Sequence, residues 1–107
     1  MADRIITYAN EHYGNARLSL GDVAAALGYD AKYLSAVFKA KTNITFTQYL
    51  RTVRVKHAAF LFEEGVESIK NVALLCGFSD ALYFSKIFRR ETGMTPTEYR
   101  KRVRNGE

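Results

Sequence analysis

Two stretches of the sequence repeat each other: VAAALGYDAKYLSAVFKAKTNITFTQYL at 23–50 and VALLCGFSDALYFSKIFRRETGMTPTEYR at 72–100. Both begin with Val-Ala, place a glycine four residues after that alanine, and carry a Thr-x-Thr-x-Tyr run near their end. One extra residue separates the glycine from the next shared tyrosine in the second copy. Two copies are too few for a solenoid, which needs about three or more to cover its core. The sequence therefore predicts a pseudo-symmetric pair of similar units.

The length and composition are those of a small globular protein. With 107 residues the chain can form one ordinary domain, or two small units that share buried surface. Hydrophobic residues make up 48% and charged residues 25%, and no apolar run approaches the roughly 18 residues that a membrane span needs. The single cysteine cannot form an internal disulfide, and the chain opens without a signal peptide. We therefore expect a cytoplasmic protein with no membrane partner.

The formal net charge of +5 is unevenly distributed. The first 30 residues are slightly acidic, whereas the segment 86–104 holds seven basic residues and two acidic ones. One interpretation of such a run is a solvated helical face, and the other is a surface for a polyanionic partner.

Apolar residues recur every three or four positions and the chain contains one proline, so the pattern predicts an all-α fold. A first helix is expected over about 3–13, with Gly14 as its left-handed C-cap. Ser19 and Ser68 are expected to cap a short helix in each copy through their hydroxyl groups.

The spacing of alanine and glycine in each copy is typical of a helix-turn-helix unit. Ala24 precedes Gly28 by four residues, as Ala73 precedes Gly77. The small alanine lets a second helix approach closely, and glycine readily adopts the positive φ of a tight turn between helices. Because the whole pattern occurs twice, the sequence predicts two helix-turn-helix units.

The second helix of each unit, about 31–42 and 81–92, is predicted to be a recognition helix, with Asn43 or Gly93 as its left-handed C-cap. Its apolar residues occupy one side, and small, polar and basic residues occupy the other. Short side chains permit close approach to the floor of a DNA major groove, while long cationic ones reach guanine edges or phosphates. This pattern predicts that Lys32, Ser35, Ala36, Lys39, Leu82, Ser85, Lys86 and Arg89 face the bases, with Arg90 beside them near phosphate.

A capping box starts the helix that follows each recognition helix. Thr45 and Thr95 are the expected N-caps, with Gln48 and Glu98 three residues later and Pro96 in the first turn. Helix starts of this kind also bind phosphate, so capping alone and phosphate contact both stay open as interpretations. The further candidate phosphate contacts are Thr45, Thr47, Thr95, Thr97 and Arg100.

The helix expected over 45–64 has no counterpart after the second unit, and we predict that it joins the two units. Its twenty or so residues span about 30 Å, near the roughly 34 Å between successive major grooves on one face of DNA. Such a spacer lets two helices enter adjacent grooves, with some bending of the DNA. The predicted division is a first helix-turn-helix subdomain at 1–44, a linker helix at 45–64 and a second subdomain at 65–107.

The segment GFSDALYFSKIFRRETGMTPTEYR (77–100), together with TQYLRTVRVKHAAFLF (47–62), resembles the DNA-binding domain of AraC-type transcription regulators. The resemblance covers essentially all of the chain after Leu18. It implies seven helices, with two helix-turn-helix subdomains on a long linker helix and recognition helices in successive major-groove segments. It also implies a bacterial regulator that binds specific double-stranded DNA sequences at the nucleoid. The base-facing positions that it implies are Lys32, Ser35, Ala36, Ala81, Leu82, Ser85 and Lys86.

Ala36 departs from the family pattern, because many members carry a long polar or basic side chain at that position. Either the second copy dominates recognition, or the first acts mainly through Lys32 and Lys39. The resemblance also implies partners besides DNA. These are a sensing or dimerisation domain outside this chain, and RNA polymerase.

An enzyme is the first alternative, with Cys76, His12 and His57 as the candidate residues. The chain has no H-E-x-x-H or C-x-x-C spacing and no glycine-rich phosphate loop. Cys76 aligns with Leu27 in the repeat, which favours a buried small hydrophobic residue over a nucleophile. We therefore expect no catalytic residue, metal site or cofactor.

The second alternative is a helical protein-protein interaction module that does not bind DNA. Tyr8, Tyr13, Phe60 and Phe62 are the aromatic residues that could form its apolar surface. The salt dependence of affinity distinguishes the two functions. DNA binding releases counterions from the phosphates, so its affinity falls steeply as the salt concentration rises, whereas the affinity of an apolar interface changes much less.

Overall fold

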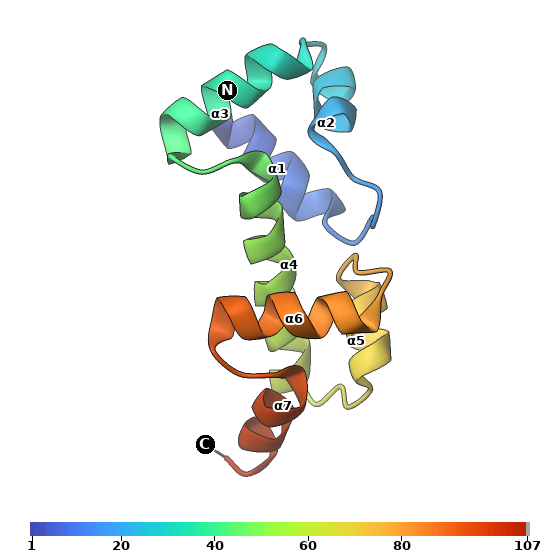
Figure 1. Cartoon of the computed structure of the whole chain (residues 1–107). Coiled ribbons are helices and arrows are strands. Elements are labelled where there is room, and N and C mark those ends of the chain that lie inside the picture. The colour runs from blue at the N-terminus through green and yellow to red at the C-terminus, as the bar shows by residue number, and fades with distance from the viewer. Residues whose placement is uncertain (107) are drawn as a thin grey trace.

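The computed structural model describes residues 1–106. Over this range the chain forms seven helices and no strand, which confirms the all-α prediction. They pack into an elongated molecule of 46 × 23 × 22 Å, in which one long helix joins two groups of shorter ones (Figure 1). The helices are α1 (Ala2–His12), α2 (Leu20–Leu27), α3 (Ala31–Thr42), α4 (Phe46–Glu63), α5 (Ile69–Leu75), α6 (Ala81–Thr92) and α7 (Pro96–Arg104). We call α1–α3 the first unit and α5–α7 the second unit.

Side-chain caps fix where most helices begin. Ser19 Oγ accepts a hydrogen bond from the Asp22 amide at 3.3 Å, and Thr95 Oγ1 accepts one from the Glu98 amide at 3.1 Å. In both cases the acidic side chain bonds back to the cap's own amide, as a full capping box requires. Thr45 forms the third box, so both predicted threonine boxes are confirmed.

The ends of α3 and α6 are as predicted, whereas the predicted end of α1 is wrong. Asn43 and Gly93 have φ of 64° and 83°, in the left-handed region expected of a C-cap. The first helix instead has Tyr13 as its C-cap, with φ of −57°, and Gly14 does not take a positive φ. The chain continues there in a right-handed turn, closed by a 3.0 Å bond from the Asn15 amide to the carbonyl three residues earlier.

Two hydrophobic cores lie one at each end of α4. The first contains Ile5, Val23, Leu34 and Phe38, all with no exposed surface, and receives Leu50 from the first half of α4. The second core receives residues from the second half of α4 and is equally well buried. Its members include Ala58, Phe62, Val72, Phe84, Ile87 and Phe88, each 2% exposed or less. One helix thus supplies side chains to both cores, which ties the two units to a common axis.

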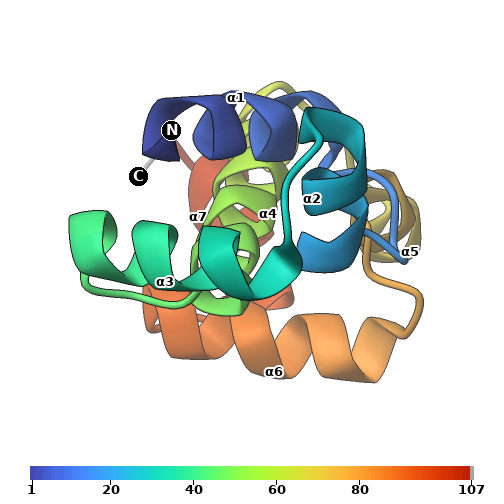
Figure 2. The same ribbon diagram turned by 90° about the horizontal axis from the view of Figure 1, so that it is seen from above.

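The second helices of the two units lie on one side of the molecule. Figure 1 shows α3 and α6 separated along the axis of α4, and Figure 2 shows both on the same face, with their N-termini at the same end. The boundaries 1–44, 45–64 and 65–107 for the subdomains and linker stay predictions, and Glu107 lies outside the described residues.

Candidate nucleic-acid interface

The helix α6 presents its polar side to solvent because its apolar side is anchored in the second core. Phe84, Ile87 and Phe88 are buried, and on the opposite side Leu82 is 82% exposed. Asp80 starts the helix by accepting a bond from the Leu82 amide at 2.8 Å, a cap that sequence reasoning missed. The structure places the predicted base-facing residues Ala81, Leu82, Lys86 and Arg89 in exposed positions, and Ser85 in a half-buried one.

The helix α3 is built in the same way in the first unit. Leu34 and Phe38 have no exposed surface. Asp30 accepts a bond from the Lys32 amide at 2.7 Å and so fixes the first turn, in the position that Asp80 holds in the second unit. The predicted base-facing residues Lys32, Ser35, Ala36 and Lys39 are all exposed.

The four threonines predicted near phosphate divide into two kinds. Thr45 and Thr95 use their hydroxyl groups as caps, accepting from the amides three residues later at 3.1 Å. Thr47 and Thr97 are exposed on the first turns of α4 and α7. The capping role is confirmed, and phosphate contact stays a prediction for all four.

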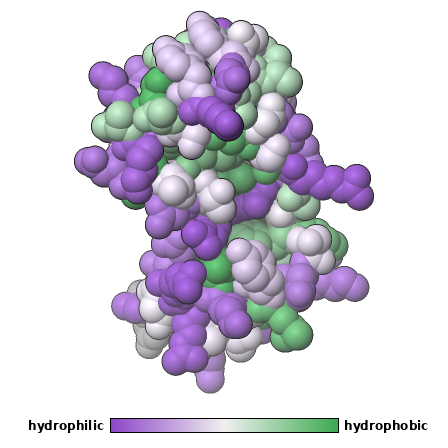
Figure 3. Space-filling view, turned by 45° about the horizontal axis from the view of Figure 1, so that its top comes forward, coloured by the Kyte–Doolittle hydropathy of each residue, from purple (hydrophilic) through white to green (hydrophobic). Residues whose placement is uncertain are grey.

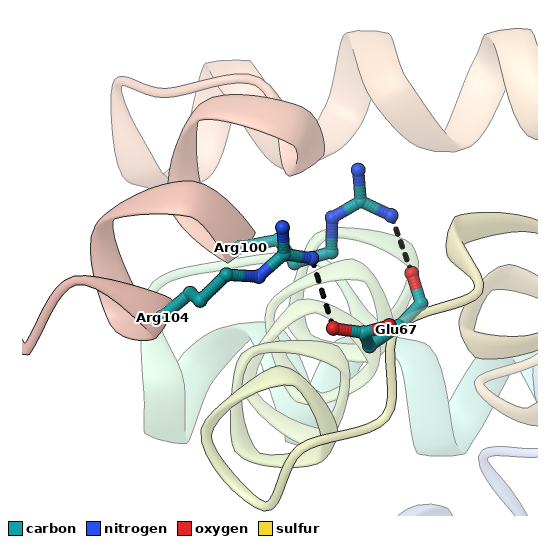
Figure 4. Close-up of polar contacts among 3 residues, drawn as sticks. All are labelled: Glu67, Arg100 and Arg104. Atoms are coloured by element: carbon teal, nitrogen blue, oxygen red, sulfur yellow. Dashed lines mark hydrogen bonds and ion pairs between the residues drawn. The ribbon is translucent and has the colours of Figure 1, made fainter.

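Arg100 ties α7 to the loop between α4 and α5. Its Nη1 donates to the backbone carbonyl of Glu67, while Arg104 Nη2 lies 2.9 Å from the Glu67 carboxylate (Figure 4). Arg100 is only half-exposed. Because part of its guanidinium is already bonded within the protein, a structural role accompanies any contact with phosphate, which stays a prediction.

A hollow between the C-terminal end of α6 and the start of α4 holds a pair of arginines, one of which the sequence reasoning missed. Arg51 and Arg90 both line it, and within residues 1–106 neither guanidinium forms a hydrogen bond or ion pair. Among residues 1–106 the acid that lines it is Glu91, whose carboxylate accepts a hydrogen bond from Thr52 Oγ1 at 3.3 Å. In the space-filling view the two lobes meet at a narrower middle, bordered by hydrophilic side chains (Figure 3). Two unpaired cations in one hollow favour an anionic ligand.

The signal for Arg51 was present in the sequence. It lies two turns inside the Thr45 capping box and on the same helical side as Gln48, three residues earlier, which lines the same hollow. Its partner in the hollow, Arg90, comes from a helix nearly forty residues later in the chain, and no local pattern brings the two together.

Of the residues considered for an enzyme, Cys76 and His57 lie in structural positions, and His12 is exposed at the end of α1. Cys76 is fully buried, as the hydrophobic interpretation predicts. Burial raises the pKa of its thiol to about 11, despite the nearby positive charge of Arg54, so the reactive thiolate is scarce. His57 stacks on Tyr13 with ring centroids 3.8 Å apart, and burial lowers its pKa. Within residues 1–106, no group of three His, Cys, Asp or Glu side chains converges as a metal site, and no helix has both the length and the apolarity to cross a bilayer.

The aromatic residues of the protein-interaction alternative do not form one surface. Phe62 is 2% exposed in the second core, and Tyr13 packs against both cores. Phe60 is 54% exposed, and Tyr8 is half-buried on α1.

Comparison with known proteins agrees with this geometry. Residues 17–102 match the family described as a helix-turn-helix domain. The C-terminal domain of AraT, a response regulator from Geobacillus stearothermophilus, is 30% identical with a TM-score of 0.89, over 94% of this chain and 83% of that one. The DNA-binding domain of AdpA, solved in complex with a target DNA, is 28% identical with a TM-score of 0.87, over 99% of this chain and 96% of that one.

Curated relatives give the same family. The transcriptional activator RhaR of Mannheimia succiniciproducens is 47% identical over 45 residues, which are 42% of this chain and 16% of RhaR. Across the first relatives matched, the chain spans 16% to 26% of their length. The chain belongs to the AraC-type family of helix-turn-helix DNA-binding domains, which serve in bacterial transcription regulators.

Proposed function

We propose that this domain binds a specific double-stranded DNA sequence by placing α3 and α6 in two successive major-groove segments. The observation that carries the proposal is the arrangement of the two helices, which lie on one side of the molecule and run in the same direction (Figure 2). Two similar helices related by a shift along one axis suit a ligand that repeats along its own axis, as duplex DNA does.

The length of α4 sets the scale of the shift. Its 18 residues span about 27 Å, somewhat less than the roughly 34 Å between major-groove segments on one face of straight DNA. Bending the duplex toward the protein shortens this distance on the inner face. We therefore propose that the bound DNA is bent toward α4.

The side chains on the outer face of each helix are proposed to read bases. Lys86 and Arg89 are long enough to bond the guanine acceptors in the groove, and Leu82 offers an apolar surface to a thymine methyl group. In the first unit Lys32 and Lys39 are the long cationic residues. Ala36 reaches less far than the long side chains of other family members, so the second unit is proposed to contribute more to specificity. Ser35, Ala81 and Ser85 complete the proposed base-facing set.

Phosphate contacts are proposed to position the protein without reading sequence. The hollow lined by Arg51 and Arg90 lies between the two groove-entering helices, where the DNA backbone would pass. Its two guanidinium groups, which form no hydrogen bond or ion pair within residues 1–106, would donate hydrogen bonds to phosphate oxygens there. The other proposed phosphate contacts are Thr45, Thr47, Thr95, Thr97 and Arg100.

The wider function is proposed from the family. The domain would act on bacterial promoters at the nucleoid, in the cytoplasm, together with RNA polymerase. A sensing or dimerisation domain would control it, in keeping with the much greater length of its curated relatives.

Selection of bound duplexes from a random pool tests the proposal. We expect two conserved segments, with centres about 10 base pairs apart. Affinity for the selected duplex should fall steeply between about 50 and 200 mM salt. Recovery of a single short segment would contradict the two-groove geometry, and a salt-insensitive interaction would favour the protein-interaction alternative.

A further inference from the structure

We propose that Arg54 is a positioning residue for DNA recognition, which locks the two units together so that α3 and α6 keep the separation and angle that two groove segments require. The inference rests on the proposed function and deepens it. Arg54 would act through the two helices rather than by touching DNA.

Arg54 lies in the middle of α4 and contacts both units. Its Nε donates to the carbonyl of Tyr13 at 3.0 Å and its Nη2 donates to the carbonyl of Asn15 at 2.8 Å, both in the segment after α1. Its guanidinium carbon lies 6.0 Å from the centre of the Phe78 ring, in the turn between α5 and α6. One side chain therefore joins the first unit, the linker helix and the helix-turn-helix turn of the second unit.

The contacts of Arg54 are directional. Its planar guanidinium presents a rigid fork of donors, so two carbonyls held at once fix the angle between α4 and the segment after α1. Within residues 1–106 it forms no ion pair with a carboxylate, and the carbonyl at the C-terminal end of α1 supplies the negative end of a helix dipole instead.

We call the contacts of Arg54 with Tyr13 and Asn15 the joint between the units. The turn between α5 and α6 packs directly against this joint. Gly77 has a φ of 89°, and a Cβ atom there would lie 2.3 Å from the Tyr13 carbonyl oxygen and 2.7 Å from Arg54 Nε. Gly14 makes a second close approach, because a Cβ there would lie 3.1 Å from the Leu75 carbonyl oxygen. The two backbones therefore meet without intervening side chains, which leaves little room for sliding.

A stacked ring pair completes the joint. Tyr13 and His57 stack with an angle of 6° between their planes, and Tyr13 packs against the cores of both units. His57 lies three residues after Arg54, on the neighbouring turn of α4. The segment after α1 is thus held to the linker by two hydrogen bonds and a ring stack. The length of α4 sets the distance between α3 and α6. The joint adds a second restraint, which sets the orientation of the two helices relative to each other.

The dependence of affinity on the spacing between the two contacted DNA segments distinguishes a positioning role of Arg54 from a role in stability alone. Inserting one base pair between the two contacted segments moves them apart by about 3.4 Å and rotates them by about 34°. A rigid protein should lose about tenfold in affinity on such a duplex. Arg54→Met keeps the apolar stem and removes all donors. We expect it to lose about tenfold on the best spacing and to discriminate less than about threefold between spacings, because the preorganised geometry is gone.

Lys56→Met is the matched control, since Lys56 is an exposed cation two residues away on the same helix. It removes the same charge and should retain the wild-type spacing preference. A duplex with only one of the two segments should bind wild type and Arg54→Met equally well. If Arg54→Met matches Lys56→Met on every spacing, the proposal is wrong.

A distance measurement on the free protein tests the joint without DNA. Spin labels at the exposed positions Ala40 on α3 and Leu82 on α6 should give a narrow distance distribution in the wild type and a broad one in Arg54→Met. The native thiol of Cys76 is buried, with its pKa raised to about 11, and should react slowly with the label. Equal widths would overturn the proposal.

The two readouts also separate this proposal from the proposed function. If the wild type itself shows no dependence on spacing, the two-groove function fails, while the distance distributions still decide the role of Arg54. Should Arg54→Met not fold, Arg54→Lys takes its place, because a single ammonium group cannot hold both carbonyls in a fixed fork. A broadened distribution in Arg54→Lys supports the proposal, and a wild-type distribution with wild-type spacing preference contradicts it.

Discussion

Gly28 and Gly77 occupy the same position in the turns of the two helix-turn-helix units, with φ of 79° and 89°. Apart from its chain neighbours, a Cβ atom on Gly28 would meet no atom of residues 1–106 within 4 Å, whereas one on Gly77 would lie 2.3 Å from the carbonyl oxygen of Tyr13. Similar local sequences thus form an open turn in the first unit and a tightly packed one in the second. Both turns have the same left-handed backbone conformation at glycine, but only the turn of the second unit forms a close contact between the units.

Alanine substitution at the two glycines tests this difference in packing, and we expect it to have the largest effect on stability. Gly28→Ala introduces only left-handed strain and should lower the free energy of unfolding by about 1–2 kcal/mol. Gly77→Ala adds an overlap with backbone and should cost about 2–5 kcal/mol in total. Urea unfolding of the two variants measures the difference. Equal losses would mean that the backbone around Gly77 can move to accept a Cβ atom without lowering the free energy of unfolding further.

The outer faces of α3 and α6 offer a second contrast between the units. Lys86→Ala should weaken binding to the selected duplex by about 1–3 kcal/mol and relax sequence preference at one position. Lys32→Ala should cost less, about 1 kcal/mol or below, if the first unit reads bases weakly. Titration of duplexes with single base changes measures both. A larger loss for Lys32→Ala would reverse the assignment of the dominant unit.

Arg51→Ala tests the hollow between the units rather than either reading face. It should weaken binding to all duplexes about equally and lower the slope of log affinity against log salt by about 1, as the loss of one phosphate contact does. Lys56→Ala on the same helix is the control of equal charge. A change in sequence preference, or no change in slope, would show that Arg51 does not contact phosphate.

The pH dependence of stability sharpens the picture of the joint and is the smallest effect expected. Burial lowers the pKa of His57 in the folded protein from the ordinary value of 6.5, so the unfolded chain binds a proton more readily. The contribution of neutral His57 is therefore present above about pH 6.5 and is lost as the pH falls below it. His57→Phe keeps a ring against Tyr13 and should show a shallower loss of stability between about pH 6.5 and 5. Identical pH profiles would remove His57 from the account.

Local rules predicted several caps of this fold, because each depends on residues a few positions apart, although the Asp30 and Asp80 N-caps were missed. The Thr45 and Thr95 boxes and the left-handed Asn43 and Gly93 followed from short-range hydrogen bonding alone. Gly14 was assigned wrongly because a glycine after a helix suggests a C-cap. In this fold it has no positive φ and instead lies where two backbones approach closely.

The contacts between the units were not predictable from the repeat. Arg54 donates to carbonyls about forty residues earlier in the chain, and Arg51 lines the same hollow as Arg90, which is similarly distant in sequence. Both arginines lie on the linker helix beyond Leu50, where the repeat ends, so comparison of the two repeats gave no signal for them. The same comparison predicted the exposed sides of α3 and α6 correctly, because the apolar residues of each helix show which side it buries.

Hydroxyl-radical footprinting of the selected duplex tests the central claim most directly. If α3 and α6 enter successive major-groove segments, the protected sugars should form two patches on one face of the duplex, with centres about 10 base pairs apart. A single protected patch, or two patches on opposite faces, would contradict the account.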